Sequence, residues 1–152
     1  MAIRPQRGYW ELEAGGVEPE LFFRALPEHF PDATTLFIEG TANASEVLAL
    51  LGEHAEAGEF LPGANTIWPE SKKLRCRFSA PLAKALAEAS RTLSVPEVCD
   101  HVFLYRGDDY LLYWHDAFDG SAGLAPDLSS DHVDAFARAL GCAAVRSELE
   151  SE

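Results

Sequence analysis

The chain has 152 residues with a hydrophobic fraction of 47%, a formal net charge of -13 and a pI near 4.7. Its length suits one domain, and its apolar content is that of an ordered globule rather than a disordered chain. So much negative charge repels phosphate groups, so we expect neither a nucleic acid nor a membrane as partner, whereas a basic protein would be attracted. High negative charge also keeps a protein soluble, and that interpretation requires no partner.

Cysteine usage and the first residues bear on the compartment. Three cysteines, an odd number at wide spacings, do not suit a disulfide framework and favour a reducing environment. Residues 1–8 lack the apolar stretch of a signal peptide, and no apolar run approaches the roughly 20 residues that span a bilayer. We therefore expect a cytoplasmic protein with a single domain over 1–152, a loose lead-in over 1–8 and a frayed acidic tail over 147–152.

The first half of the chain alternates strand and helix patterns. Residues 9–13 alternate large apolar with acidic residues, as a short edge strand does. Pro19 between two glutamates is typical of a helix start, and Asn43 with a glutamate three residues later is typical of a second, over 44–57. Between them, the apolar run over 34–39 predicts a buried strand.

The second half adds hairpins and further helices. Residues 66–68 and 74–78 are predicted to pair, and Ser79 is a natural cap for a helix over 80–92. Helices interspersed with hairpins favour an α+β fold, with a mixed, mostly antiparallel sheet of five to six strands and three to four helices packed on it. The remaining elements, in order, are a central hairpin over 100–116, a Gly-rich loop over 117–126, a helix over 131–140 and a short strand over 142–145.

The central hairpin organises this prediction. Two runs rich in aromatic and aliphatic residues, 100–105 and 110–116, flank the sequence Arg-Gly-Asp-Asp, which is typical of a turn. Both faces of the hairpin are largely apolar near the turn, so we expect it to lie within the sheet or to be covered on both sides. A four-residue loop sets the register. The resulting pairs are Tyr105 with Tyr110, His101 with Trp114, and Asp100 with His115.

The open end of this hairpin gathers the polar residues that could carry chemistry. A carboxylate beside an imidazole, as in the expected pair Asp100 and His115, can act as a general base. The same pair can also be a hydrogen-bonded couple that satisfies two polar groups at the end of a sheet. His101 and Asp116 lie beside it and complete the candidate catalytic set.

Zinc would accept these residue types, but the expected register sends His101 and His115 to opposite faces of the sheet. A one-residue slip would bring them together and would require a five-residue loop. We therefore predict no metal site and no cofactor.

Two groups of residues are candidates for binding. Lys73, Arg75 and Arg77 share one face of a predicted strand, where they could hold an anion or an acidic segment of a partner. They could equally be the solvated face of a strand whose charges discourage edge pairing. Aromatic side chains that look exposed could anchor a protein interface. These are Tyr9, Trp10 and Trp68.

Charge and the missing catalytic signatures together favour a binding protein over an enzyme. We expect an acidic cytoplasmic protein-binding domain, for example an inhibitor or immunity-type partner of a basic protein. One alternative is a small hydrolase or metal-assisted enzyme that uses Asp100, His101, His115 and Asp116. Another is a homodimer whose extra apolar strand faces are buried against a second copy.

Overall fold

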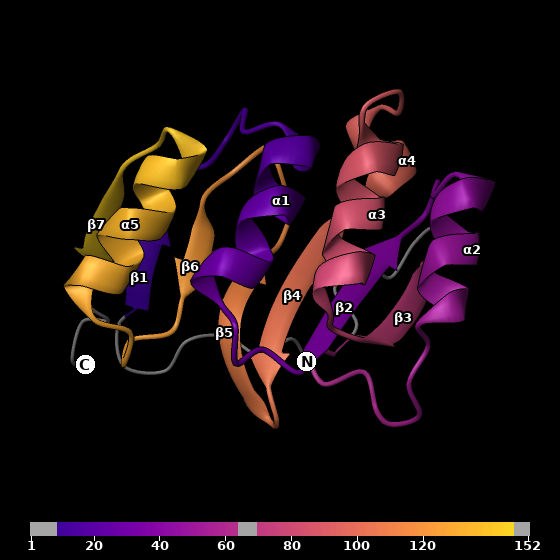
Figure 1. The fold of residues 1–152 in the computed structure, drawn as a ribbon, viewed down its shortest axis with the longest axis horizontal. Coiled ribbons are helices and arrows are strands. Elements are labelled where there is room, and N and C mark those ends of the chain that lie inside the picture. The colour runs from indigo at the N-terminus through magenta and orange to yellow at the C-terminus, as the bar shows by residue number, and fades with distance from the viewer. Residues whose placement is uncertain (1–8, 64–69, 148–152) are drawn as a thin grey trace.

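The computed structural model describes residues 9–63 and 70–147. Within them, seven strands form one antiparallel sheet in the order β3-β2-β4-β5-β6-β1-β7 (Figure 1). The strands are β1 (Tyr9–Leu12), β2 (Thr35–Gly40), β3 (Lys72–Arg77), β4 (His101–Arg106), β5 (Asp109–Trp114), β6 (Ala122–Leu124) and β7 (Ala144–Ser147). The helices are α1 (Pro19–His29), α2 (Ser45–Glu53), α3 (Ala80–Ser90), α4 (Val95–Val98) and α5 (Ser130–Leu140).

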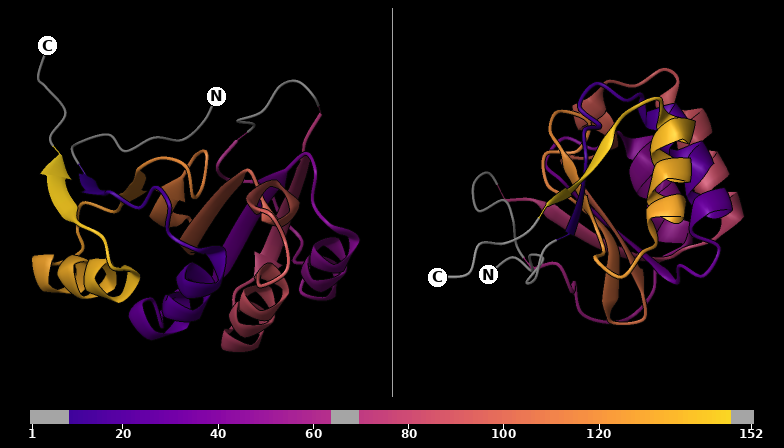
Figure 2. Two further views of the ribbon diagram at one scale, coloured as in Figure 1. Left: turned by 90° about the horizontal axis from the view of Figure 1, so that it is seen from above. Right: turned by 90° about the vertical axis from the view of Figure 1, so that its left-hand side faces the viewer.

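The four longer helices form a second layer on one face of the sheet (Figures 1 and 2). They lie side by side in the order α5, α1, α3, α2. Phe22 of α1 contacts Trp114 of β5 and Phe118 edge to face, with ring centroids 5.1 and 5.5 Å apart. These rings lie in the main core between helices and sheet, so the large aromatic residues of distant segments hold the two layers together.

Local signals explain where several helices begin and end. The Ser79 hydroxyl accepts a hydrogen bond from the Leu82 N–H at the start of α3, as its position predicts. Gly141 ends α5 with φ of 70°, a left-handed conformation that glycine adopts easily. The predicted cap at Asn43 is wrong: the N-cap of α2 is Ala44, and the Asn43 amide donates instead to the Val98 carbonyl oxygen, 2.8 Å away.

The sheet is larger and more regular than the sequence predicts. The α+β class is confirmed, but the sheet has seven strands rather than five to six; the described residues hold five helices, and the four longer ones pack on the sheet. The extra strand β6 lies in the stretch predicted to be a Gly-rich loop. Strand β1 is not at an edge, because it pairs with both β6 and β7. β3 pairs with β2, and its predicted partner over 66–68 lies outside the described residues.

The face of the sheet opposite the helices carries a second apolar cluster. It consists of Phe37, Phe103, Tyr105 and Tyr113, all buried. Phe60, from the segment that follows α2, contacts Phe37 and Phe103 with ring centroids 5.2 and 6.2 Å apart. A segment of the same chain therefore covers this apolar face, and its burial does not require a second copy of the protein.

Arg75 of β3 holds this covering segment in place. Its guanidinium forms an ion pair with Glu56 at 3.0 Å and donates to the Glu59 carbonyl oxygen at 3.0 Å. It also lies over the Phe37 ring, 5.6 Å from the centroid.

Of the helices that the structure describes, none has the length and apolar character needed to cross a lipid bilayer.

Candidate functional site

A β-bulge in the central hairpin determines how the candidate residues meet. Tyr105 lies opposite Tyr110, as predicted, but Leu104 lies opposite Leu112, so Leu111 is an extra residue on β5. Leu111 and Leu112 both belong to the core on the helix side. The alternation of side chains is therefore shifted by one residue along the rest of β5.

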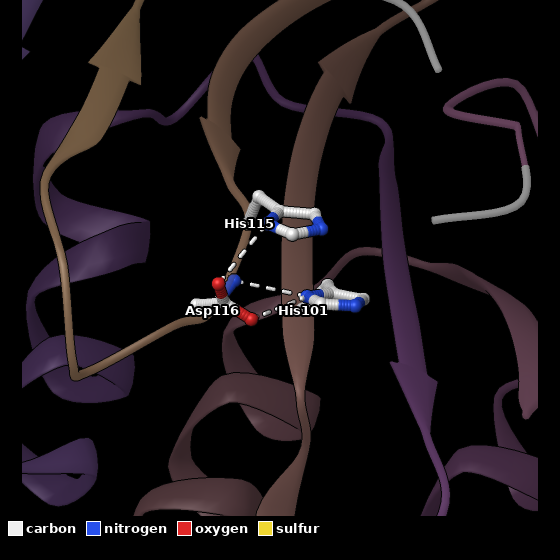
Figure 3. A group of neighbouring side chains, drawn as sticks. All are labelled: His101, His115 and Asp116. Atoms are coloured by element: carbon white, nitrogen blue, oxygen red, sulfur yellow. Dashed lines mark hydrogen bonds and ion pairs between the residues drawn. The ribbon is translucent and has the colours of Figure 1, made fainter. Parts of the chain in front are cut away.

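The shift overturns the predicted pairs His101–Trp114 and Asp100–His115. Trp114 lies opposite Val102 and is buried on the helix side. The imidazole rings of His101 and His115 stack on each other instead, with centroids 4.1 Å apart and planes 12° from parallel (Figure 3). The bulge thus brings together the two histidines that a regular register would separate, and it does so without a longer loop.

His101 is buried, and its hydrogen bonding fixes its tautomer. Its side chain is 3% exposed, and Nδ1 accepts a hydrogen bond from the Asp116 N–H at 2.9 Å. Nδ1 therefore carries no proton, and the neutral ring is protonated at Nε2. Burial lowers the pKa of His101 below its usual value, and the neighbouring His115 lowers it further; Glu39, Asp116 and Asp100 oppose this effect.

His115 and Asp116 form an exposed pair at the mouth of the site. His115 is 46% exposed, and its Nδ1 lies 3.3 Å from Oδ2 of Asp116. Asp116 has φ of 54° and Phe118 has φ of 71°, a region that residues other than glycine seldom adopt. Strain of this kind tends to occur at functional sites. In this conformation the Asp116 amide points toward His101, and the Asp116 carboxylate points toward His115.

Asp100 has a different partner from the one predicted. Its carboxylate accepts hydrogen bonds from the Thr41 N–H at 3.0 Å and from the Thr41 hydroxyl at 2.9 Å. Asp100 therefore links the start of β4 to the turn after β2. The carboxylate that orients His115 is that of Asp116.

A pocket of about 520 Å³ opens beside His101. Its carboxylates are those of Asp100, Asp116 and Asp119, and no lysine or arginine is among the described residues that line it. Burial raises the pKa of the Cys99 thiol strongly, so this group stays protonated and is a poor nucleophile. The other lining residues are His101, Val95, Pro96, Ala117 and Phe118.

The same cluster can be tested against a metal ion. His101, His115 and Asp116 each offer a ligand atom, and these atoms lie within 4.8 Å of one another. A metal needs nitrogen lone pairs that converge, but these lie in the ring planes, and the two planes are nearly parallel. Nδ1 of His101 is also occupied by the Asp116 amide. The arrangement is therefore not preformed for a metal, and His115 would have to rotate to bind one.

The residues predicted to bind a partner do not form one surface. β3, which carries Lys73, Arg75 and Arg77, lies at the other end of the sheet from β1, which carries Tyr9 and Trp10. Lys73 and Arg77 are exposed, whereas Arg75 makes the internal contacts described above.

The predicted aromatic anchors are also partly used within the protein. Trp10 donates from Nε1 to the Leu128 carbonyl oxygen at 3.0 Å, and the Arg146 guanidinium lies 5.1 Å from the centroid of its ring. Tyr9 is half-buried. Trp68 lies outside the described residues.

The lowered pKa of His101 predicts a stability that depends on pH. Below the ordinary value of 6.5, the unfolded chain takes up a proton on this histidine before the folded protein does, so acidification favours unfolding. We expect the free energy of unfolding to fall between about pH 7 and about pH 5, and to fall less in His101→Asn. Urea titrations across this range measure it. An equal fall in both proteins would contradict the prediction.

The chemistry of the site thus has two parts. The charged residues that line the pocket beside His101 are all acidic, a lining that favours a cation over an anion. The His115–Asp116 pair offers an oriented and exposed imidazole.

No family model, curated protein or solved structure matches this chain.

Proposed function

We propose that this protein binds a basic protein partner, and that a cationic side chain of the partner enters the pocket beside His101. The observation that carries the proposal is the lining of this pocket, which combines three aspartates with no lysine or arginine among its described residues. The net charge of -13 adds a long-range attraction for a basic protein.

The pocket suits both parts of a lysine or arginine side chain. Such a side chain has an apolar stem and a charged head. Val95, Pro96 and Phe118 offer apolar surface to the stem. Asp116 and Asp119 are exposed and offer carboxylates to the head. An inhibitor or immunity-type role would follow if the basic surface of the partner is also the surface with which it acts.

The test replaces the carboxylates without changing shape. In Asp116→Asn/Asp119→Asn, we expect about tenfold weaker binding of a fluorescent peptide of alternating lysine and glycine, because two charges at the pocket are lost. The matched control is Glu28→Gln/Asp32→Asn, which changes the net charge equally at two exposed residues near the end of α1. Fluorescence anisotropy at low and at physiological salt gives both affinities.

Comparison of these two double variants distinguishes binding at the pocket from attraction by the overall charge. Affinity lost only in the Asp116 and Asp119 variant supports the pocket. Equal losses in both would mean that overall charge alone attracts the peptide, as expected if the charge serves only solubility. Thermal melts of both variants show whether they are folded.

A second candidate function is hydrolysis with His115 as general base. The specific observation is the 3.3 Å contact that lets Asp116 orient the exposed ring, next to a pocket that could hold a substrate. The base would activate water, since the Cys99 thiol is buried and protonated. Hydrolysis of a panel of nitrophenyl esters that falls at least about 100-fold in His115→Ala would support this role; activity unchanged in that variant would refute it.

A further inference from the structure

A second pocket, of about 360 Å³, lies at the opposite end of the central hairpin, beside its turn. Neither the polar cluster around His101 nor the proposed function uses it. The pocket combines aromatic hydroxyls, carboxylates and a short apolar wall. Its lining residues are Tyr105, Asp108, Asp109, Tyr110, Ala125, Pro126 and Asp127.

Two tyrosines that line this pocket have hydroxyls without a hydrogen-bond partner in the part of the chain that the structure describes. The Tyr105 side chain is 1% exposed, and neither its hydroxyl nor that of Tyr110 has a hydrogen-bond partner among the described residues. Buried polar groups are nearly always hydrogen-bonded, because leaving water without a replacement bond is unfavourable. A phenylalanine would fill either position without this penalty, so the hydroxyls call for an explanation beyond the described residues.

Both hydroxyls keep their protons at any physiological pH. Burial raises the pKa of Tyr110 to about 12; the negative charge of Asp127 contributes to the rise, and the positive charge of Arg146 opposes it. Burial also raises the pKa of Tyr105. The pocket is therefore lined by two neutral tyrosines and by the carboxylates of Asp108, Asp109 and Asp127. The two hydroxyl oxygens are buried, so a ligand would reach these acceptors only by displacing the atoms that cover them.

Two arginines close to this pocket are not among the residues that line it. The Arg146 guanidinium donates to the Pro126 carbonyl oxygen at 3.0 Å and lies over Trp10, and Arg146 is not among the lining residues. Arg106 is exposed at the end of β4 and is not among them either. The lining side chains thus present mainly acceptors, negative charge and aromatic rings, which together fit a cation with many hydrogen-bond donors.

We infer that this pocket binds a guanidinium group, as on an arginine side chain. A guanidinium has five N–H donors in one plane, enough to satisfy both hydroxyls and a carboxylate together. Its flat face also stacks on a tyrosine ring, which the ammonium of lysine does less well. The inference stands on this pocket alone and does not require the proposed role of the pocket beside His101.

The direct test measures the binding of capped arginine (N-acetyl-arginine methylamide) to the full chain by NMR or calorimetry. The expected order of affinity is capped arginine above capped lysine, with the neutral isostere capped citrulline weakest. Free arginine separates the sources of the ligand, because it has the same net charge as capped arginine but carries an α-ammonium and a carboxylate in place of the two peptide groups. Weaker binding of free arginine indicates an arginine within a peptide, and equal binding indicates a small molecule.

Tyr105→Phe and Tyr110→Phe distinguish a ligand site from a packing defect. Each is expected to weaken capped arginine about tenfold while leaving thermal stability unchanged or higher, because an unpartnered buried hydroxyl is removed. Asp127→Asn is expected to weaken it as well, whereas Glu88→Gln, an exposed acid on α3, leaves it unchanged. The inference is overturned if citrulline binds as well as arginine, if the phenylalanine variants bind normally, or if no binding occurs at millimolar ligand.

Discussion

Replacing His101 with alanine is expected to lower the free energy of unfolding by about 2–3 kcal/mol. The side chain is buried, stacks on His115 and accepts the Asp116 N–H. Alanine removes the packing and leaves the amide without its acceptor. It also removes a contact that holds Asp116 at φ of 54°, where an aspartate is strained. Urea denaturation at about pH 7.5, where a histidine with a lowered pKa is neutral, measures the loss.

Two variants separate the hydrogen bond from the packing. In His101→Asn, the amide oxygen can occupy the place of Nδ1 and accept the Asp116 N–H, so we expect part of the lost stability to return. His115→Ala removes a ring that is 46% exposed, and we expect a change within about 0.5 kcal/mol. A loss in His115→Ala as large as in His101→Ala would contradict the view that the buried histidine holds this end of the hairpin.

The sequence predicts the hairpin because the relevant signals are local. The turn sequence lies between two aromatic and aliphatic runs, and the strands pair as expected around it, with Tyr105 opposite Tyr110. The runs are apolar on both faces, and β4 is accordingly covered by helices on one side and by Phe60 on the other. Short elements such as β6 have weaker signals, because three residues carry no detectable alternation.

The geometry of the site could not be predicted in the same way. A bulge depends on how two consecutive leucines, Leu111 and Leu112, both pack against helices that are distant in sequence. The sequence places the four polar residues at one end of the hairpin, but the bulge decides that His101 meets His115. The left-handed conformation of Asp116, which replaces Asp100 as the partner of His115, has no local signal such as a glycine.

The pocket beside the turn shows a further limit of sequence reasoning. Asp108 and Asp109 suggest only turn chemistry, and Tyr105 and Tyr110 suggest only strands. These residues line a pocket only together with Pro126 and Asp127, which the chain after β6 places beside the turn. A hydroxyl without a partner is visible only when all of its neighbours are known.

The covering segment predicts the second large effect. In Gly58→Ala, we expect the free energy of unfolding to fall by about 2 kcal/mol. Gly58 has φ of 137°, which an alanine resists, and an added Cβ would lie 2.6 Å from the Arg75 Cζ. Arg75 would have to move and lose contacts to Glu56, Glu59 and Phe37. The matched control is Gly52→Ala in α2, where a Cβ meets nothing within 4 Å and alanine should stabilise by about 0.5–1 kcal/mol.

Arg75→Ala tests whether the two residues act through the same contact. If Gly58→Ala destabilises by displacing the Arg75 guanidinium, then Gly58→Ala in the Arg75→Ala background should cost less than it does alone, because the clash has gone and only the backbone strain remains. Strictly additive losses would mean that the strain at φ of 137° explains the whole effect. Either single variant should also increase the binding of an apolar fluorescent dye, since loosening Phe60 uncovers Phe37 and Phe103.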